Sequence, residues 1–359
     1  MTVVVAGAGM AGLVAAARLR QLGETPTILE KGDRPGGSML LSSGVIWRYR
    51  SLEGFREECP GGDAELQALI FEQLDERLDW LESLGATVTA LETSNPRTLG
   101  RRFLPGPLVE ALLRRAENVH FGQPLDELDD LPVVLATGGF GAALARRLSL
   151  PLRASPWSEG DGFALARGRG AAPTPGMDEF YGRALPAAPA TVQEADFVRL
   201  AQVYGRHAVV IDETGSVIES AHCAWHENDL VQQIARRPAG RAWYLVAEET
   251  LDLSAGDASI RDRIEAARGA GGTVVSPDQL TFPVPSGYVL AVHVTASVTH
   301  TIGGMAVDRN ARVLDDHGTP IEGLYAAGVD VGGVATGGYA SGLATALVLG
   351  CVAAESIAS

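Results

Sequence analysis

Glycine-rich runs near both ends of this chain have a spacing that brings the backbone close to a ligand. Residues 7–12 read Gly-Ala-Gly-Met-Ala-Gly, which fits the pattern G-x-G-x-x-G. In that pattern Gly7 permits a tight turn, Gly9 lets a pyrophosphate approach closely, and Gly12 lets a helix pack on a strand. The first N–H groups of the following helix have no partner within it, so they can bind phosphate oxygens. The run therefore predicts a dinucleotide site.

The residues around this run supply the elements that must position it. Residues 2–6 are a β-branched run typical of a buried parallel strand, and residues 13–22 continue as a helix that ends at Gly23. Residues 26–30 indicate a second strand, which ends in Glu30 at the spacing expected of an acid that binds a ribose 2′-hydroxyl. A strand, a glycine run, a helix and a strand that ends in an acid follow one another in this order. This order favours dinucleotide binding far more strongly than the glycine run alone does.

The loop after Glu30 bears on the choice between NAD and FAD, because both cofactors use this unit. Residues 31–38 read Lys-Gly-Asp-Arg-Pro-Gly-Gly-Ser, which is too rich in glycine for a simple crossover. Backbone amides at Gly36 and Gly37 could reach the pyrophosphate from a second side. The alternative is an ordinary loop.

The carboxy-terminal part of the chain repeats the glycine pattern in residues 300–304, 323–333 and 338–344. A strand, a glycine-dense turn and a helix of small residues follow one another, so the main chain could press against a flat ligand. The first turn of the last helix would aim N–H groups at electron-rich ligand atoms. Together with the amino-terminal site, this segment predicts FAD held by the two ends of the chain.

Composition limits the partners and the compartment. The net charge of the 359 residues is −15, which disfavours nucleic acid and anionic membranes as partners. No run of about 18 apolar residues predicts membrane insertion, and the amino terminus lacks the basic region of a signal peptide. The three cysteines, Cys59, Cys223 and Cys351, form no pairable pattern. We therefore expect a cytoplasmic protein without disulfides.

The remaining patterns predict an α/β fold with one split domain. Residues 63–84 and 107–116 have the pattern of helices, and residues 132–135 that of another buried strand. Strand and helix patterns of a different character fill residues 186–286, before strand and glycine-turn patterns return. We expect a Rossmann-type FAD-binding domain from residues 1–185 and 287–359, with an inserted α+β domain over residues 186–286.

With these pieces in order, the chain resembles the fumarate reductase and 3-ketosteroid dehydrogenase superfamily of flavoproteins. Residues 36–47 resemble the second FAD loop of that family, in the ketosteroid dehydrogenase version that contains Gly-Ile-Trp (here Gly-Val-Ile-Trp), so that branch is the closer one. Residues 136–140 and 159–166 match its middle signatures, and residues 300–304 and 323–333 its carboxy-terminal ones. The resemblance implies that the inserted domain caps the flavin. It also implies hydride transfer between flavin N5 and a carbon β to a carbonyl, with a proton exchanged at the α-carbon.

Two positions depart from the fumarate reductases. Those enzymes bind a substrate carboxylate through an Arg near the start of the last helix, where this chain has Tyr339. Their capping domain supplies an Arg as proton donor, and residues 222–226 here read His-Cys-Ala-Trp-His. Since Tyr and Trp cannot replace bidentate recognition by guanidinium, C4 dicarboxylates are not the expected substrates. We expect a cyclic or apolar carbonyl compound, with a C=C bond made or reduced.

The candidate catalytic residues are Tyr339, His226, His300 and His222. Tyr339 could donate to the substrate carbonyl as enolate charge develops, or simply pack. His226 could exchange the α-proton, or be a solvated loop residue; His222 and His300 are reserve candidates, and a buried structural role is the alternative for His300. His222 and His226 have the spacing of a metal pair, but no third ligand is evident and we expect no metal. Arg97, Arg101 and Arg102 are expected on a surface loop.

The predicted FAD contacts fall on every glycine run and on the polar residues beside them. Asp330 follows the position of the acid in the family's usual Ala-Gly-Glu turn and is expected to take over its ribityl contact. The whole set comprises Gly7, Gly9, Met10, Ala11, Gly12, Glu30, Lys31, Gly36, Gly37, Ser38, Ser42, Ser43, Gly44, Thr137, Gly138, Asp161, Gly328, Asp330, Ser341, Gly342 and Leu343.

Three functions remain open from the sequence. The first is an FAD-dependent dehydrogenase or ene-reductase acting on CH–CH bonds, whose partners are a small carbonyl substrate and a diffusible electron acceptor or donor. The second is an FAD-dependent amine or hydroxyl oxidase. The third is a flavin-binding protein that has lost catalysis.

Overall fold

The computed structural model describes residues 1–93, 95–128, 132–218 and 223–359, and contacts within it divide the chain into two units. Unit 1 comprises residues 1–143, 154–180 and 300–359; unit 2 comprises residues 144–153 and 181–299. No helix among the described residues is long and apolar enough to cross a membrane. His222, one of the reserve catalytic candidates, lies outside the described residues.

A six-stranded sheet forms the centre of unit 1, in the order β15-β16-β7-β1-β2-β6. Five of the strands run parallel, and β15 joins the edge antiparallel. Their bounds are β1 Thr2–Ala6, β2 Thr25–Glu30, β6 Val119–Phe121, β7 Val133–Leu135, β15 Arg312–Leu314 and β16 Pro320–Ala326. The predicted strands at residues 2–6, 26–30 and 132–135 and the α/β Rossmann fold are confirmed.

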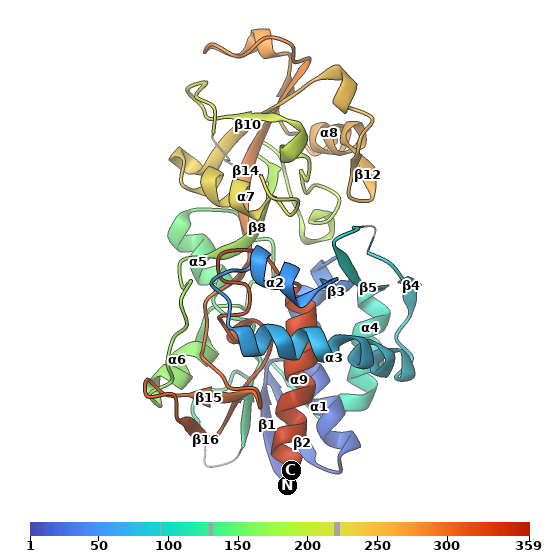
Figure 1. The fold of residues 1–359 in the computed structure, drawn as a ribbon, viewed down its shortest axis with the longest axis vertical. Helices are drawn as coiled ribbons and strands as arrows, with labels where there is room; N and C mark the ends of the chain where they lie inside the picture. Colours follow the sequence, from blue (N-terminus) through green and yellow to red (C-terminus); the bar gives the residue numbers. More distant parts are fainter. Residues whose placement is uncertain (94, 129–131, 219–222) are drawn as a thin grey trace. The chain divides into compact units, whose positions relative to one another are not determined.

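Two helices from opposite ends of the sequence lie side by side on this sheet (Figure 1). They are α1 (Met10–Gln21), which follows β1, and α9 (Gly342–Ala358), which ends the chain. Both are rich in small residues, and Gly350 of α9 lies so near α1 that a Cβ there would be 2.8 Å from the carbonyl oxygen of Ala11. Small residues thus allow the two helices to pack at close range.

The other elements of unit 1 surround this pair. Asp63 caps α3 by accepting the N–H groups of Glu65 and Leu66, each at 2.9 Å, as the sequence pattern predicted. The helices are α2 Leu52–Glu58, α3 Ala64–Ser83, α4 Pro105–Ala116, α5 Gly141–Leu148, which continues into unit 2, and α6 Asp161–Gly168. A second sheet contains β3 Val45–Tyr49, β5 Thr98–Phe103 and β4 Val88–Ala90, in the order β3-β5-β4.

The sequence predicted a surface loop for Arg97, Arg101 and Arg102, and this prediction is wrong for the last two. Arg101 and Arg102 lie on β5, which pairs antiparallel with β3. Gly100 sits so close to β3 that a Cβ would lie 2.1 Å from the carbonyl oxygen of Ile46. The glycine that suggested a loop is there because two strands approach closely, a use of glycine that local composition does not reveal.

Unit 2 is built on a five-stranded sheet in which β14 pairs with β8, β10 and β13, and β10 pairs with β9. The strands are β8 Phe180–Pro186, β9 Val209–Ile211, β10 Arg241–Val246, β13 Val274–Val275 and β14 Leu290–Thr301. Helices α7 Asn228–Ala235 and α8 Ile260–Gly269 and the hairpin β11 Ser254–Ala255 with β12 Ala258–Ser259 complete it. Ile211, Leu245 and Ala291 form a core cluster on this sheet.

The unit boundaries differ from the predicted domain boundaries in three places. Residues 144–153 join unit 2, and the next division falls between residues 180 and 181 rather than between 185 and 186. The carboxy-terminal division falls near the end of β14, at Thr299–His300, rather than between residues 286 and 287. The reason is that β14 is a single long strand whose first residues pair within unit 2. The expectation that unit 2 caps the flavin stays a prediction.

Candidate functional site

The three glycines of the amino-terminal run have different surroundings. A Cβ on Gly7 would lie 2.3 Å from the carbonyl oxygen of Ala136, and one on Gly12 would lie 1.9 Å from that of Gly7. A Cβ on Gly9, by contrast, would meet no protein atom within 4 Å. Gly7 and Gly12 are therefore glycines because the protein is tightly packed there. Gly9 keeps open the space in front of the first turn of α1, which begins with Met10 and Ala11.

The second glycine pair lies against the first, as the sequence predicted for a two-sided site. Gly36 forms a bridge with Gly9, and its N–H donates to the carbonyl oxygen of Ala8 at 2.8 Å. A Cβ on Gly37 would lie 3.3 Å from the Cα of Gly9. Gly36 has a φ of 100°, a conformation that glycine adopts readily. The loop therefore crosses close to the helix N-terminus instead of passing away from it.

A pocket at the carboxyl ends of β1 and β2, which we call the Glu30 pocket, brings together five predicted contact residues: Gly7, Glu30, Lys31, Thr137 and Asp161. The Glu30 carboxylate accepts the N–H groups of Ala8 and Gly32, both at 2.6 Å, and is 9% exposed. Each carboxylate oxygen can accept a further hydrogen bond, so a ligand hydroxyl can still donate to it. Lys31 and Asp161 form an ion pair at 2.7 Å on the same wall.

Sequence reasoning missed the aromatic wall of the Glu30 pocket. Trp157 lines it and is 40% exposed, an unusually high value for a tryptophan. Its ring lies beside Gly32, where a Cβ would come within 2.5 Å of the indole nitrogen. The sequence offered one indication that Trp157 belongs to the site: it lies two residues before the signature at residues 159–166.

Asp330 organises the glycine turn that follows β7. Its buried carboxylate accepts the N–H and the hydroxyl of Thr137 and, at 3.0 Å, the N–H of Gly139. Burial raises the pKa of Asp330, while these hydrogen bonds oppose that rise. The acid therefore holds the turn that contains Thr137 and Gly138 in place. Its expected ribityl contact stays a prediction.

The serines of the second glycine loop already have protein partners. Ser38 accepts the N–H of Ser155 at 3.0 Å, and the Ser42 hydroxyl donates to the carbonyl oxygen of Met39 at 2.7 Å. A Cβ on Gly44 would lie 2.0 Å from the carbonyl oxygen of Phe103, so this glycine serves packing, while Ser43 is exposed. Their expected contacts with a cofactor stay predictions.

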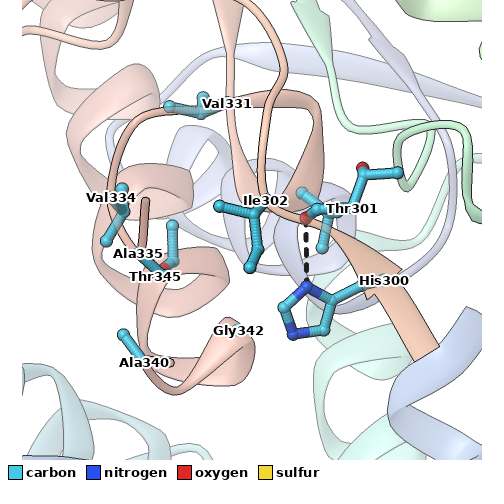
Figure 2. A pocket seen from close by; sticks show the side chains of 11 residues that line it. His300, Thr301, Ile302, Val331, Val334, Ala335, Ala340, Gly342 and Thr345 are labelled. Atoms are coloured by element: carbon cyan, nitrogen blue, oxygen red, sulfur yellow. Dashed lines mark hydrogen bonds between the residues drawn. The ribbon is translucent and has the colours of Figure 1, made fainter. Parts of the chain in front are cut away.

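A second pocket, the His300 pocket, lies at the start of α9 (Figure 2). Three predicted residues line it, His300, Gly328 and Gly342, with Ala340 beside them. Ser341, also predicted, caps α9 by accepting the N–H of Ala344 at 3.3 Å, and Leu343 follows in the first turn. The other lining residues are mostly apolar and were not predicted: Thr301, Ile302, Val329, Val331, Val334, Ala335 and Thr345.

His300 is held in a defined tautomer. Its Nδ1 lies 3.1 Å from the carbonyl oxygen of Thr301, which can only accept, so Nδ1 carries the proton and the neutral ring has its lone pair on Nε2. A Cβ on Gly342 would lie 3.3 Å from that Nε2. Burial lowers the pKa of His300, so the neutral form predominates at pH 7. An imidazole in this state can accept a proton at the pocket.

Tyr339 stands in an aromatic cluster just before α9. Its ring packs edge-on against Trp47, with centroids 5.4 Å apart, and Trp47 packs on Tyr49 at 5.3 Å. The Tyr49 hydroxyl donates to the backbone carbonyl of Tyr339 at 2.6 Å. Both the side chain and the backbone of Tyr339 are thus fixed by residues of β3.

His226 belongs to unit 2 and differs from its prediction. Its Nδ1 accepts the N–H of Asn228 at 3.1 Å, so the neutral ring carries its proton on Nε2. Burial, together with the charge of Arg183, lowers the pKa of His226 to about 4. The alternative of a solvated loop residue is therefore wrong, because His226 is only 4% exposed. Within the described residues no group of three or more His, Cys, Asp or Glu side chains could hold a metal ion.

Comparison with known proteins identifies the family of this chain and its cofactor. Residues 127–344 match the model of an FAD binding domain, and residues 5–43 match that of an NAD(P)-binding Rossmann-like domain. The chain belongs to the FAD binding domain family. FAD is therefore its cofactor, as predicted. The open space at Gly9, the helix N-terminus behind it and the acceptors of Glu30 fit the pyrophosphate and ribose of this cofactor.

The relatives of this FAD-family chain confirm the resemblance seen in its motifs. It is 25% identical to "Probable fumarate reductase Ifc3" of Shewanella frigidimarina, over 99% of the chain and 74% of that protein. A KsdD-like steroid dehydrogenase of Mycobacterium tuberculosis is 46% identical over 67 residues, which are 19% of this chain and 12% of that protein. The fold matches 3-ketosteroid Δ1-dehydrogenase from Sterolibacterium denitrificans with a TM-score of 0.75 and 16% identity, covering 99% of both chains. The chain is an FAD-dependent oxidoreductase homologous to these enzymes.

Proposed function

We propose that this flavoprotein makes or reduces the C=C bond α,β to a carbonyl in a cyclic or apolar compound. The observation that carries the proposal is the aromatic cluster before α9, where Tyr339 stands packed against Trp47 at 5.4 Å. A phenol and an indole at this position suit a ring with a carbonyl, whereas a dicarboxylate needs guanidinium groups. The relatives are named as fumarate reductases and steroid dehydrogenases, both of which fit CH–CH chemistry.

Three arginines on or beside β3 and β5 support the same substrate class. Arg101 pairs with Asp79 at 2.6 Å and with Glu82, and Arg97 lies 3.1 Å from Glu58. Arg48 pairs with Asp75. Guanidinium groups already paired with carboxylates would have to break those pairs before binding a substrate carboxylate. These three arginines are therefore poor candidates for a dicarboxylate clamp.

Proton exchange at the α-carbon belongs to His300 in this proposal, with Tyr339 donating to the carbonyl oxygen. Neutral His300 has its lone pair on Nε2 at the pocket, so it can accept the α-proton during desaturation and return it during reduction. His226 in its neutral state presents N–H at Nε2 and cannot accept a proton there. When bound, FAD supplies the acceptor or donor of the hydride exchanged with the β-carbon. Electrons then pass to or from a diffusible partner.

Turnover with paired substrates tests the proposal. The enzyme, supplied with a chemically reduced dye, should reduce a cyclic enone and leave fumarate unreduced; with an oxidised dye it should desaturate a saturated cyclic ketone. Product analysis by mass spectrometry would show a change of two hydrogens. Rapid reduction of fumarate, with no activity on any cyclic ketone, would overturn the assignment of substrate class.

A further inference from the structure

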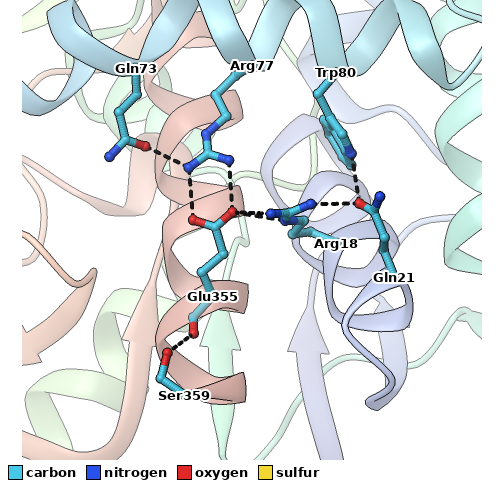
Figure 3. A network of polar contacts seen from close by, with 7 residues as sticks. All are labelled: Arg18, Gln21, Gln73, Arg77, Trp80, Glu355 and Ser359. Carbon is cyan, nitrogen blue, oxygen red and sulfur yellow. Dashed lines mark hydrogen bonds and ion pairs between the residues drawn. The ribbon is translucent and has the colours of Figure 1, made fainter.

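A partly buried ionic network joins three helices of unit 1 near the carboxyl end of α9, away from the His300 pocket at its start (Figure 3). Glu355 of α9 accepts two hydrogen bonds from Arg77 of α3, both at 2.8 Å. The same carboxylate also binds Arg18 of α1. Its oxygen lies 2.9 Å from Nε of Arg18 and 2.7 Å from a terminal guanidinium nitrogen. Arg77 thus makes a bidentate contact with both carboxylate oxygens, which fixes direction as well as distance, whereas both nitrogens of Arg18 lie against Oε1 alone.

The network holds its members in a partly buried setting. The Arg77 side chain is 9% exposed, that of Arg18 22%, and that of Glu355 30%. Gln73 accepts one further hydrogen bond from Arg77, and Gln21 accepts one from Arg18, each at 2.8 Å. The Nε atom of Arg77 is buried without a partner among the described residues. Several hydrogen bonds that converge on one carboxylate favour one arrangement of the three helices. The network lies outside both pockets and touches no residue that we place in catalysis.

Contacts along α1 and α9 show that the two helices run parallel in a fixed register. Gly350 lies against Ala11, near the start of α1, and Glu355 pairs with Arg18, further along it. Gly342 begins α9 and precedes Gly350 by eight residues. At 1.5 Å per residue, α9 therefore begins roughly 10 Å before the start of α1, measured along their common direction from N- to C-terminus.

We infer that the Arg18–Glu355–Arg77 network sets this register and thereby the distance between the two helix N-termini that hold the pyrophosphate and the flavin ring of FAD. The inference rests on the proposed placing of the flavin at the start of α9; the α1 end is the pyrophosphate site at Gly9. Gly350 permits the close approach of the helices, and the ion pairs prevent sliding. Arg18, Arg77 and Glu355 are positioning residues, since none of them touches the site itself.

The inference predicts an effect on FAD that ADP does not share. ADP reaches only the α1 end, so its binding does not depend on the offset of α9. Glu355→Gln removes the negative charge and turns an amide N–H₂ towards the guanidinium donors. Arg18→Gln removes only the ion pair between α1 and α9. We expect each variant to raise the Kd of FAD about tenfold or more while the Kd of ADP stays within about twofold.

The experiment uses the holoenzyme. Dilution of the holoenzyme gives the Kd of FAD from the fluorescence of the released flavin, and displacement of FAD by increasing amounts of ADP then gives the Kd of ADP. Arg101→Gln is the matched control, because Arg101 pairs with two acids of α3, Asp79 and Glu82, and should change neither constant. If Glu355→Gln fails to fold, Arg18→Gln decides alone. A parallel weakening of FAD and ADP, or no change in either, would overturn the inference. Turnover on cyclic ketones is measured separately, so the substrate proposal stands or falls on its own.

Discussion

Each of the two units of this protein contains a histidine with a backbone partner, half-buried His300 in unit 1 and buried His226 in unit 2, yet the two rings carry their protons on different nitrogens. In unit 1 the Nδ1 of His300 donates to a carbonyl, which leaves a lone pair on Nε2 at a pocket. In unit 2 the Nδ1 of His226 accepts a backbone N–H, which places the proton on Nε2. Burial lowers the pKa of both rings. The difference teaches that the partner of one ring nitrogen, and not burial, decides whether a histidine can act as a base.

The largest effect is expected in unit 1, where the structure keeps space for a ligand. Gly9→Val should abolish retention of FAD, because its side chain would fill the space of the pyrophosphate while meeting no protein atom within 4 Å of its Cβ. The absorbance of bound flavin after gel filtration measures this. Gly269→Val is the matched control in unit 2, since a Cβ there also meets nothing within 4 Å. If the Gly9→Val protein kept its full FAD content, the assignment of the pyrophosphate site to the space at Gly9 would be refuted.

The same substitution in both histidines tests the comparison itself. His300→Gln should lower turnover of a cyclic ketone about 10²–10⁴-fold, because the α-proton loses its acceptor. His226→Gln should change turnover only a few-fold, since its Nε2 carries a proton. Steady-state rates on one substrate with one dye give both numbers, and bound flavin is measured to confirm loading. Equal losses in the two variants, or a loss in His226→Gln alone, would reverse the assignment.

A smaller loss is expected when the carbonyl donor is removed. Tyr339→Phe should lower kcat about 10²–10³-fold with FAD affinity unchanged, because the phenol stabilises charge that develops only during reaction. Tyr325→Phe, the same change on β16, is the control and should have wild-type activity. Wild-type kcat in Tyr339→Phe would leave Tyr339 with a packing role only.

The smallest effect concerns the stability of the fold and its dependence on pH. The pKa of His226 falls from 6.5 to about 4 on folding, so the unfolded chain binds a proton that the folded chain refuses between these values. Stability from this group is complete above pH 6.5 and is lost as the pH falls towards 4, by about 3 kcal/mol. His226→Asn keeps the acceptor for the Asn228 N–H and removes the titration. Denaturant unfolding at pH 7 and pH 4.5 should show a smaller loss for the variant than for the wild type; identical losses would contradict the assigned pKa.

The sequence predicted best those features that local patterns encode. The strand at residues 2–6, the glycine run, the helix capped by Asp63 and the small-residue helix at the end all occur close to their predicted places. These depend on periodicity, caps and turns between near neighbours. The FAD cofactor followed from the order of such local motifs.

What the sequence could not reveal depends on contacts between distant residues. Asp330 binds Thr137 across 193 positions, so its engagement with the turn after β7 is invisible in any local pattern. The strand around Arg101 was mistaken for a loop because Gly100 serves contact with β3. The tautomer and the low pKa of His226 come from burial in unit 2 and from Asn228, which only the folded chain brings into place.

The most direct test of the proposed chemistry is the redox state of the flavin in the absence of oxygen. Oxidised enzyme is mixed with a saturated cyclic ketone, and reduced enzyme with the corresponding enone, while the visible absorbance of the flavin is followed. The account predicts that at least one of these mixtures changes the flavin's redox state, and that succinate and fumarate leave it unchanged. A flavin that responds only to succinate or fumarate, or only to amines or alcohols, would contradict the account.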